Sequence, residues 1–216
     1  MSLRTAIFDL DGTLIDSKPG ITACVQHALR ALGESVPSAD DLEWTIGPPM
    51  IESLAKLVGA ERAPEAQRIY RARYAEAGLF DNRVYDGIED LLARLQADGY
   101  ALYVATSKLQ PFARKIVDHL GFDRFFREVY GTGLDGSFLH KDALLAHVLS
   151  DARIDATEAA MIGDRRHDVI GARANGLPAI GVRWGYGEPG ELEAAGAAAF
   201  AARAVEIPAV LDDLLG

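Results

Sequence analysis

The segment Thr5-Ala-Ile-Phe-Asp-Leu10 is a short apolar run, and Asp11-Gly12-Thr13 follows it directly. A run of this length and composition is typical of a strand buried inside a parallel sheet. Similar runs recur along the chain, at Tyr100–Ala105, Glu128–Tyr130, Ala159–Ile162 and Ala179–Val182. Helical patterns fill the intervals, from Asp86 to Gly99, Gln110 to Leu120, Lys141 to Leu149 and Asp168 to Asn175. The alternation predicts an α/β fold, a Rossmann-like doubly wound parallel sheet with helices on both faces.

One long stretch carries helical patterns and no strand pattern. Between Ser17 and Asn82, apolar residues recur at helical spacing in three segments. Each segment begins near a proline and ends at a glycine: Pro19 to Gly33, Pro48-Pro49 to Gly59, and Pro64 to Gly78. We predict an α-helical cap at residues 17–83, inserted into a catalytic core made of residues 1–16 and 84–216. The alternative is that these helices belong to the helical layer of the core itself.

Charge and composition narrow the classes of partner. The chain has 216 residues, 49% of them hydrophobic, and a formal net charge of −10. An acidic protein is a poor non-specific partner for a nucleic acid polymer or an anionic membrane surface. The single cysteine, Cys24, allows neither an internal disulfide nor a CxxC metal site. The apolar runs are too short for a membrane span, and the first strand pattern begins too early for a signal peptide, so we expect a cytoplasmic protein.

An acidic pair stands where the first strand ends. Asp9 and Asp11 are two residues apart and point the same way while the chain is extended. In parallel sheets, ligands bind beyond the carboxyl ends of the strands, which gives this pair a chemical interpretation. Gly12 permits an abrupt turn and lets backbone N–H groups approach an anion. Taken alone, the motif is equally compatible with an Asx-type turn or part of a calcium loop.

Further polar residues follow the later strands. Thr106-Ser107-Lys108 comes after the second strand, Lys141 begins a helix, and Gly163-Asp164-Arg-Arg-His-Asp168 comes after the fourth strand. All of them can meet at one edge of the sheet. Carboxylates there would bind Mg²⁺, while a hydroxyl and an ammonium group would hold phosphate oxygens. Lys108 competes with Lys141 for the role of the phosphate-binding lysine, because it directly follows the Thr-Ser pair.

These motifs resemble those of the haloacid dehalogenase superfamily of phosphotransferases. The resemblance covers essentially the whole chain, including the helical cap. It is closest to the bacterial phosphatases of the 5′-nucleotidase-like and phosphoglycolate-phosphatase-like groups. The segments that carry this closer similarity are Ile46-Gly-Pro-Pro49, Gly78-Leu-Phe80, Val84-Tyr-Asp-Gly87, Met161–Asp168 and Gly185-Tyr-Gly187. The resemblance strongly implies the fold and the type of reaction, but not the substrate.

The resemblance also implies a role for each motif residue. Asp9 would be the nucleophile that forms an aspartyl-phosphate. Asp11 would protonate the leaving oxygen, then deprotonate water, and its backbone carbonyl would bind Mg²⁺. Asp9 and Asp164 would be direct metal ligands, and Asp168 would be a further ligand or would orient the metal-bound waters. The phosphate-binding residues would be Gly12, Thr106, Ser107 and Lys141. The dehalogenases of the superfamily lack a second acid at the position of Asp11, which argues against dehalogenation here.

The cap is expected to select the substrate, because the core offers only phosphate and metal contacts. We expect Lys18, Pro48, Pro49 and Glu52 to lie near the substrate. The expected substrates are small soluble phosphate esters, with nucleoside 5′-monophosphates ahead of 2-phosphoglycolate, and the chain is expected to be a monomer or a homodimer. Two alternatives stay open: a sugar-phosphate mutase with the same core motifs, and, more remotely, a non-hydrolytic phospho-accepting receiver module. Two GxGxxG strings, at residues 131–136 and 185–190, lie outside the first βα unit and do not favour a dinucleotide site.

Overall fold

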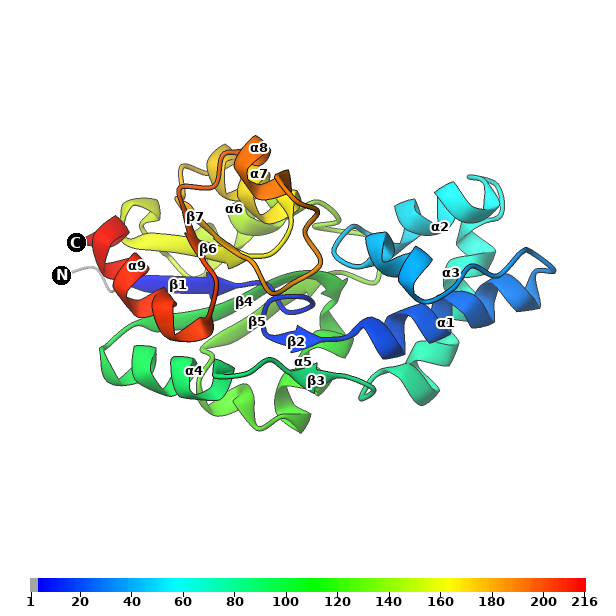
Figure 1. The fold of residues 1–216 in the computed structure, drawn as a ribbon, viewed down its shortest axis with the longest axis horizontal. Helices are drawn as coiled ribbons and strands as arrows, with labels where there is room; N and C mark the ends of the chain where they lie inside the picture. Colours follow the sequence, from blue (N-terminus) through cyan, green and yellow to red (C-terminus); the bar gives the residue numbers. More distant parts are fainter. Residues whose placement is uncertain (1–3) are drawn as a thin grey trace.

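A computed structural model describes residues 4–216 of the chain. Six parallel strands form the main sheet in the order β5-β4-β1-β6-β7-β8 (Figure 1). Their bounds are β1 Thr5–Phe8, β4 Ala101–Leu109, β5 Glu128–Thr132, β6 Ala159–Gly163, β7 Ala179–Val182 and β8 Ala199–Ala201. β1 lies between β4 and β6, and Phe8, its last residue, pairs with Val104 in the middle of β4 and with Ile162 near the end of β6. The predicted Rossmann-like α/β core is confirmed.

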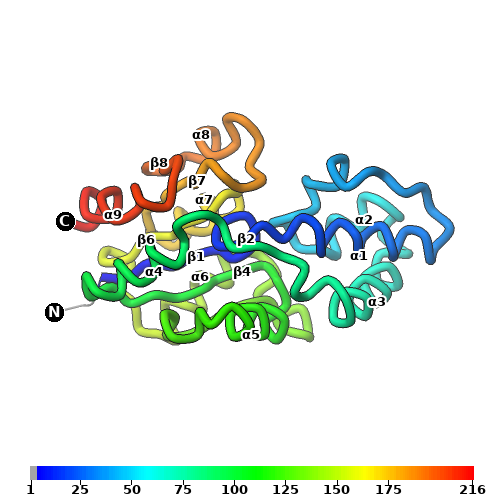
Figure 2. The backbone as a smooth tube through the Cα atoms, turned by 60° about the horizontal axis from the view of Figure 1, so that its bottom comes forward, coloured from blue at the N-terminus to red at the C-terminus, as the bar shows by residue number. Residues whose placement is uncertain are grey.

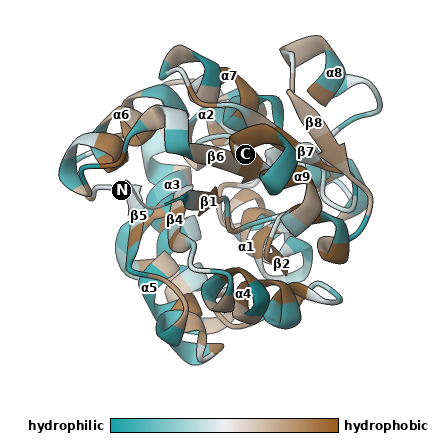
Figure 3. Cartoon of the chain, turned by 90° about the vertical axis from the view of Figure 1, so that its left-hand side faces the viewer, coloured by the Kyte–Doolittle hydropathy of each residue, from teal (hydrophilic) through white to brown (hydrophobic). Residues whose placement is uncertain are grey.

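Alternation along the strands divides the core into two apolar layers. In β1, Ala6 and Phe8 pack into one buried cluster, whereas Ile7 packs into the other. The first layer lies under α4 Ile88–Ala97, α5 Gln110–His119 and α9 Ile207–Leu215, and the second under α6 Lys141–Asp151, α7 Arg166–Ala174 and α8 Glu191–Ala195. Figure 3 shows hydrophobic strands, such as β1 and β6, between helices that carry both hydrophobic and hydrophilic residues. A strand buried on both faces needs apolar side chains at odd and even positions, which explains the continuous apolar runs.

The helices of residues 17–83 lie at one end of the molecule, beyond the carboxyl ends of the strands (Figure 1). They are α1 Lys18–Ala31, the 3₁₀ helix Asp40–Thr45, α2 Met50–Val58, α3 Ala63–Arg73 and the π-helical turn Tyr74–Gly78. The chain enters this region through β2 Ile15–Asp16 and leaves it through β3 Arg83–Val84, which pair antiparallel. Figure 2 shows the two passages side by side. We call residues 17–83 the cap.

The structure extends and corrects the sequence-based boundaries. β4 and β5 run beyond the predicted ends, and the predicted helix from Pro64 to Ala77 is α3 followed by the π-helical turn. No element was predicted at the two-residue strands β2 and β3, or at α8, β8 and α9. Met1–Leu3, part of the segment used to argue against a signal peptide, lie outside the described residues. Within residues 4–216, the helices are too short or too polar to cross a membrane.

Candidate active site

Three buried carboxylates converge at the carboxyl edge of the sheet. Asp9 follows β1, Asp164 follows β6, and Asp168 lies in the first turn of α7. Each of the three offers a carboxylate oxygen, and these oxygens lie within 4.8 Å of one another. The convergence follows from the register, because β1 and β6 are parallel neighbours and Phe8 pairs with Ile162. The three predicted acidic residues are therefore brought together, as a hard, oxygen-binding cation would require.

The carboxylate of Asp164 is held by two hydrogen bonds. Thr13 Oγ1 donates a hydrogen bond to its Oδ1 at 3.1 Å, and the backbone N–H of Tyr186 donates to its Oδ2 at 2.8 Å. Gly12 has φ +85°, and a Cβ atom there would lie 2.2 Å from Asp164 Oδ2. Glycine is required at this position both for the turn and for the close approach. The backbone of the Asp11-Gly12-Thr13 turn thus packs directly against the acidic cluster.

Lys141 supplies the positive charge of the cluster. It begins α6, its side chain is 2% exposed, and its Nζ lies 3.1 Å from Asp9 Oδ1 and 2.8 Å from Asp168 Oδ1. It also donates a hydrogen bond of 2.8 Å to the carbonyl of Ala105, in the middle of β4. Burial lowers the pKa of Lys141, but the carboxylates of Asp168 and Asp9 outweigh this effect and raise it overall. The ammonium group is therefore charged and fixed between the two acids.

One lysine does not neutralise three buried acids. Burial, with the charges of Asp168 and Asp11, raises the pKa of Asp9 to about 7, despite the opposing effects of Lys141 and the Leu10 N–H. Burial also raises the pKa of Asp164 well above its usual value, with added repulsion from Asp168 and Asp9. Like charges packed together in a buried site favour protonation unless a cation is present. The donor set, its burial and its excess negative charge fit a divalent metal ion such as Mg²⁺.

Asp11 lies beside this cluster and has a different partner. Its Oδ1 is 3.0 Å from Lys108 Nζ, in an ion pair whose side chains are 10% and 6% exposed. Thr106 and Ser107 line the same cleft as Asp9 and Asp11. Asp9, Asp11, Thr106 and Ser107 therefore face one cleft, whereas Lys141 lines an adjoining hollow that Ser107 shares. The two competing lysines pair with different acids: Lys141 with Asp9 and Asp168, and Lys108 with Asp11.

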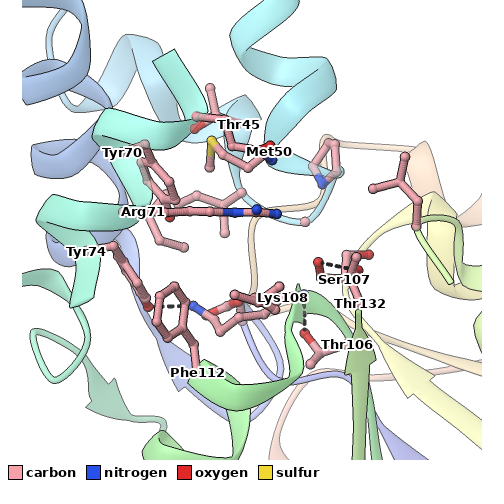
Figure 4. Close-up of a pocket in the computed structure, with 18 of the residues that line it drawn as sticks. Thr45, Met50, Tyr70, Arg71, Tyr74, Thr106, Ser107, Lys108, Phe112 and Thr132 are labelled. Atoms are coloured by element: carbon pink, nitrogen blue, oxygen red, sulfur yellow. Dashed lines mark hydrogen bonds and ion pairs between the residues drawn. The ribbon is translucent and has the colours of Figure 1, made fainter. Parts of the chain in front are cut away.

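The cap closes the other side of the cleft. Its contribution is mainly apolar and aromatic, from Ile21, Ile46, Pro48, Met50, Tyr70 and Tyr74. Figure 4 shows Met50, Tyr70 and Tyr74 on the cap side of the cleft and Thr106, Ser107 and Lys108 on the core side, with the guanidinium of Arg71 pointing into the space between them. The side chain of Arg71 makes no hydrogen bond or ion pair with any residue of the described part of the chain. Arg71 and Gln67 are thus polar cap groups available to a ligand.

The four cap residues expected near the substrate are placed differently. Pro48 lines the cleft, and Pro49 lines an adjoining hollow that also contains Ser107 and Lys141. Lys18 does not line the cleft: its Nζ pairs with Asp40 at 2.7 Å and Glu43 at 2.6 Å, within the cap. Glu52 does not line it either, and its carboxylate lies 3.6 Å from His140 Nε2.

Several site residues escaped the sequence analysis. Arg71 lies in α3 and Tyr74 begins the π-helical turn after it, and the helical pattern predicted there does not tell which side chains face the cleft. Arg165 lies inside the acidic motif and donates a hydrogen bond to the cap carbonyl of Ile46. Tyr186, in the Gly185-Tyr-Gly187 segment, donates a 2.6 Å hydrogen bond to Asp16 and accepts from the backbone of Ser17 and Lys18. Arg165 therefore joins the core to the cap at Ile46, and Tyr186 joins it to the start of the cap.

Replacing Lys141 by alanine is expected to impair both stability and activity. Asp9 and Asp168 would keep their burial and lose their cation, and breaking a buried pair in this way costs roughly 3–5 kcal/mol. Urea unfolding with EDTA present would measure the free energy of unfolding, and phosphate release would measure activity. Loss of activity in Lys108→Ala, with Lys141→Ala at the wild-type rate, would assign the phosphate-binding role to Lys108 instead.

Comparison with known proteins agrees with this geometry. Residues 6–182 match the haloacid dehalogenase-like hydrolase family. The chain is 47% identical over 190 residues to a 5′-nucleotidase of Pseudomonas aeruginosa, covering 87% of this chain and 86% of that one. It is 45% identical over 186 residues to the tyrosine-protein kinase PtkA of Mycobacterium tuberculosis, covering 86% of this chain and 64% of the length of PtkA. The crystal structure of a predicted phosphatase from Clostridium acetobutylicum superposes with a TM-score of 0.94 at 37% identity, covering 99% of this chain and all of that one.

A parallel α/β core with an acidic cluster at its carboxyl edge and a helical cap over it defines a class of phosphoryl-transfer enzymes. The chain belongs to the haloacid dehalogenase-like hydrolase family, and within it we class the protein as a phosphatase.

Proposed function

We propose that this protein is a Mg²⁺-dependent phosphomonoesterase that acts on small soluble phosphate esters through an aspartyl-phosphate on Asp9. The observation that carries the proposal is the buried arrangement of Asp9, Asp164 and Asp168 around Lys141, with Asp11 close by on the same cleft. Among the esters we favour nucleoside 5′-monophosphates over 2-phosphoglycolate. The similarity to a protein named 5′-nucleotidase supports this choice.

The side chains divide the chemistry between them. Asp9 attacks phosphorus and forms the P–O bond of the acyl phosphate, while the ester P–O bond breaks. Asp11 gives a proton to the departing oxygen and afterwards takes one from the attacking water. Lys141 and the hydroxyl of Thr106 hold phosphoryl oxygens and reduce the repulsion between two anions. A Mg²⁺ ion held by Asp9, Asp164 and Asp168 would supply further neutralisation of the phosphoryl charge.

Phosphate release from a panel of esters, with Mg²⁺ or with EDTA, tests the proposal. The panel contains AMP, GMP, UMP, 2-phosphoglycolate, several sugar phosphates and p-nitrophenyl phosphate. We expect release with Mg²⁺ and a loss of at least about 10²-fold with EDTA that added Mg²⁺ restores. Equal rates in EDTA would contradict the metal requirement. Transfer of phosphate to a second carbon of a sugar phosphate, in place of release, would identify a mutase.

Arg71 is expected to contribute to recognition of the part of the ester beyond phosphate. A guanidinium offers five donors and has no partner among the described residues, so a bound nucleoside or carboxylate would satisfy it. We expect Arg71→Ala to raise KM for the preferred ester by about 10- to 100-fold, the effect of losing one charged hydrogen bond. Phenyl phosphate, which has no acceptor beyond its phosphate, should change far less.

A neighbouring arginine provides the matched control. Arg73, two residues along α3, pairs with Glu76 at 3.2 Å and does not line the cleft. Arg73→Ala should leave the ranking of esters unchanged. An equal increase in KM for phenyl phosphate and the preferred ester in Arg71→Ala would show that Arg71 contacts the phosphate instead.

A further inference from the structure

Lys108 is a core residue whose ammonium group contacts both the core and the cap. Lys108 and Thr106 both line the cleft, from the last part of β4, where the pairing with β5 is irregular. The backbone N–H of Lys108 donates to Thr106 Oγ1 at 3.2 Å, which fixes the direction in which the side chain leaves the strand. The Nζ then lies 3.0 Å from Asp11 Oδ1 and 2.5 Å from the hydroxyl of Tyr74 (Figure 4).

Asp11 depends on this lysine for its orientation. Its Oδ1 is buried and accepts no well-directed hydrogen bond from any residue between 4 and 216, so the ion pair with Lys108 is the contact that holds it. The pair is nearly closed off from water, with side chains 6% and 10% exposed. A charge pair in such surroundings is held more firmly than one at the surface, where water screens it.

Tyr74 is in turn held by the cap. It begins the π-helical turn, stacks on Tyr70 at a centroid distance of 5.5 Å and contacts Phe112 at the same distance. A Cβ atom on Gly78, at the end of that turn, would lie 2.6 Å from Cys24 and 2.8 Å from the Tyr74 ring, so glycine allows the turn to pack against α1. The ammonium of Lys108 lies 4.5 Å from the centre of the Tyr74 ring, a cation–π contact that adds to the hydrogen bond.

We propose that Lys108 is a positioning residue for Asp11, and that the cap residue Tyr74 sets the position of Lys108. The carboxylate that transfers the proton is then aligned when Tyr74 and the rest of the cap cover the cleft. An open cap would remove Tyr74 from Lys108 and leave Asp11 less restrained, so that proton transfer is coupled to enclosure of the substrate. This inference rests on the proposed phosphomonoesterase function and adds two residues to its machinery.

The leaving group of the substrate provides the test. An alkoxide, as from a nucleoside 5′-monophosphate, needs a proton to depart, whereas p-nitrophenolate does not. We expect Lys108→Met to lower kcat/KM for AMP by about 10- to 100-fold, a part of the 10²–10⁴ that general acid catalysis contributes. The same variant should keep kcat/KM for p-nitrophenyl phosphate within about threefold of wild type. Tyr74→Phe, which removes only the hydroxyl, should show the same pattern at about three- to tenfold, and Lys108→Arg should restore part of the AMP rate.

Matched controls separate positioning from general damage. Lys115→Met changes an exposed lysine of α5. Tyr103→Phe removes a hydroxyl from a buried tyrosine in the apolar layer opposite to that of Tyr74. Neither variant should alter the ratio of kcat/KM for AMP to kcat/KM for p-nitrophenyl phosphate. If Lys108→Met fails to fold, Tyr74→Phe and Lys108→Arg still give the ratio. An unchanged ratio in Tyr74→Phe, or an equal loss for both esters with a raised KM in Lys108→Met, would overturn the proposal and make Lys108 a phosphate-binding group. Absence of ester hydrolysis in the wild-type enzyme would instead contradict the proposed function.

Discussion

Asp9→Asn is expected to reduce phosphate release from every ester by about 10⁴-fold or more, the scale seen when a covalent nucleophile is removed. The amide has the shape of the carboxylate but does not form an acyl phosphate. The variant should still fold, because the ionised form of Asp9 is disfavoured in its buried site: burial and the charges of Asp168 and Asp11 raise its pKa to about 7. A neutral amide removes that repulsion, although it also weakens the contact with Lys141. Loss of activity without a large loss of stability would separate chemistry from structure.

Rates and melting temperatures of Asp9→Asn and Asp90→Asn would measure this separation. Asp90 is an exposed acid in the first turn of α4 and does not line the cleft. Asp90→Asn should therefore retain the wild-type rate. Both proteins should be assayed with the same Mg²⁺ concentration and after the same purification, since a trace of another phosphatase would mimic residual activity. Wild-type turnover by Asp9→Asn would rule out the covalent route.

The sequence contained most of what is needed to predict the core of the site. Asp9 and Asp164 each follow a strand and Lys141 begins a helix, and the rule that strand ends of a parallel sheet share one edge is enough to bring them together. Thr106 was expected after a strand but lies inside β4. The strands themselves were visible because burial on both faces leaves uninterrupted apolar runs. Prediction of this kind uses local pattern and one rule of topology.

The cap was much harder to predict in detail. Lys18 looked available for substrate, but the 3₁₀ helix Asp40–Thr45 places Asp40 and Glu43 on its ammonium group, and the fold of that loop has no periodic signal. Tyr74 and Lys108 are 34 residues apart and meet because the cap folds over β4, which no local pattern encodes. The strand β8 lies in an alanine-rich segment whose composition does not distinguish a strand from a helix.

Contacts with the cap and with α8 hold the Asp164–Asp168 loop in place. Arg165 extends from the Asp164–Asp168 loop, pairs with Glu191 at 3.0 Å and donates to the carbonyl of Ile46 in the cap. Both side chains of the pair are 6% exposed, so the loop is held by a buried ion pair on one side and by the cap on the other. Arg165 and Glu191, which take no part in the chemistry, therefore help to orient Asp164 and Asp168, which do.

Asp11→Asn is expected to slow turnover by about 10²–10⁴-fold and to let the aspartyl-phosphate accumulate. The variant keeps Asp9 and Lys141, so attack on phosphorus remains possible, particularly on p-nitrophenyl phosphate, whose leaving group departs without a proton. Hydrolysis of the acyl phosphate then lacks the base that activates water. Among the described residues that line the cleft, Asp9 is the other acid, and it carries the phosphoryl group at this step.

Labelled substrate and an acid quench would measure the trapped intermediate. With substrate labelled in its phosphate, Asp11→Asn should retain label on the protein in near-stoichiometric amount, removable by hydroxylamine as an acyl phosphate is. The double variant Asp9→Asn, Asp11→Asn has the same acid removed and no nucleophile, so it should carry no label. Label on the double variant would place the phosphoryl group on a residue other than Asp9, and wild-type turnover by Asp11→Asn would assign proton transfer to another group. Retention of label in the single variant alone is the result that joins Asp9 and Asp11 in one reaction, the first as nucleophile and the second as the acid and base that completes the cycle.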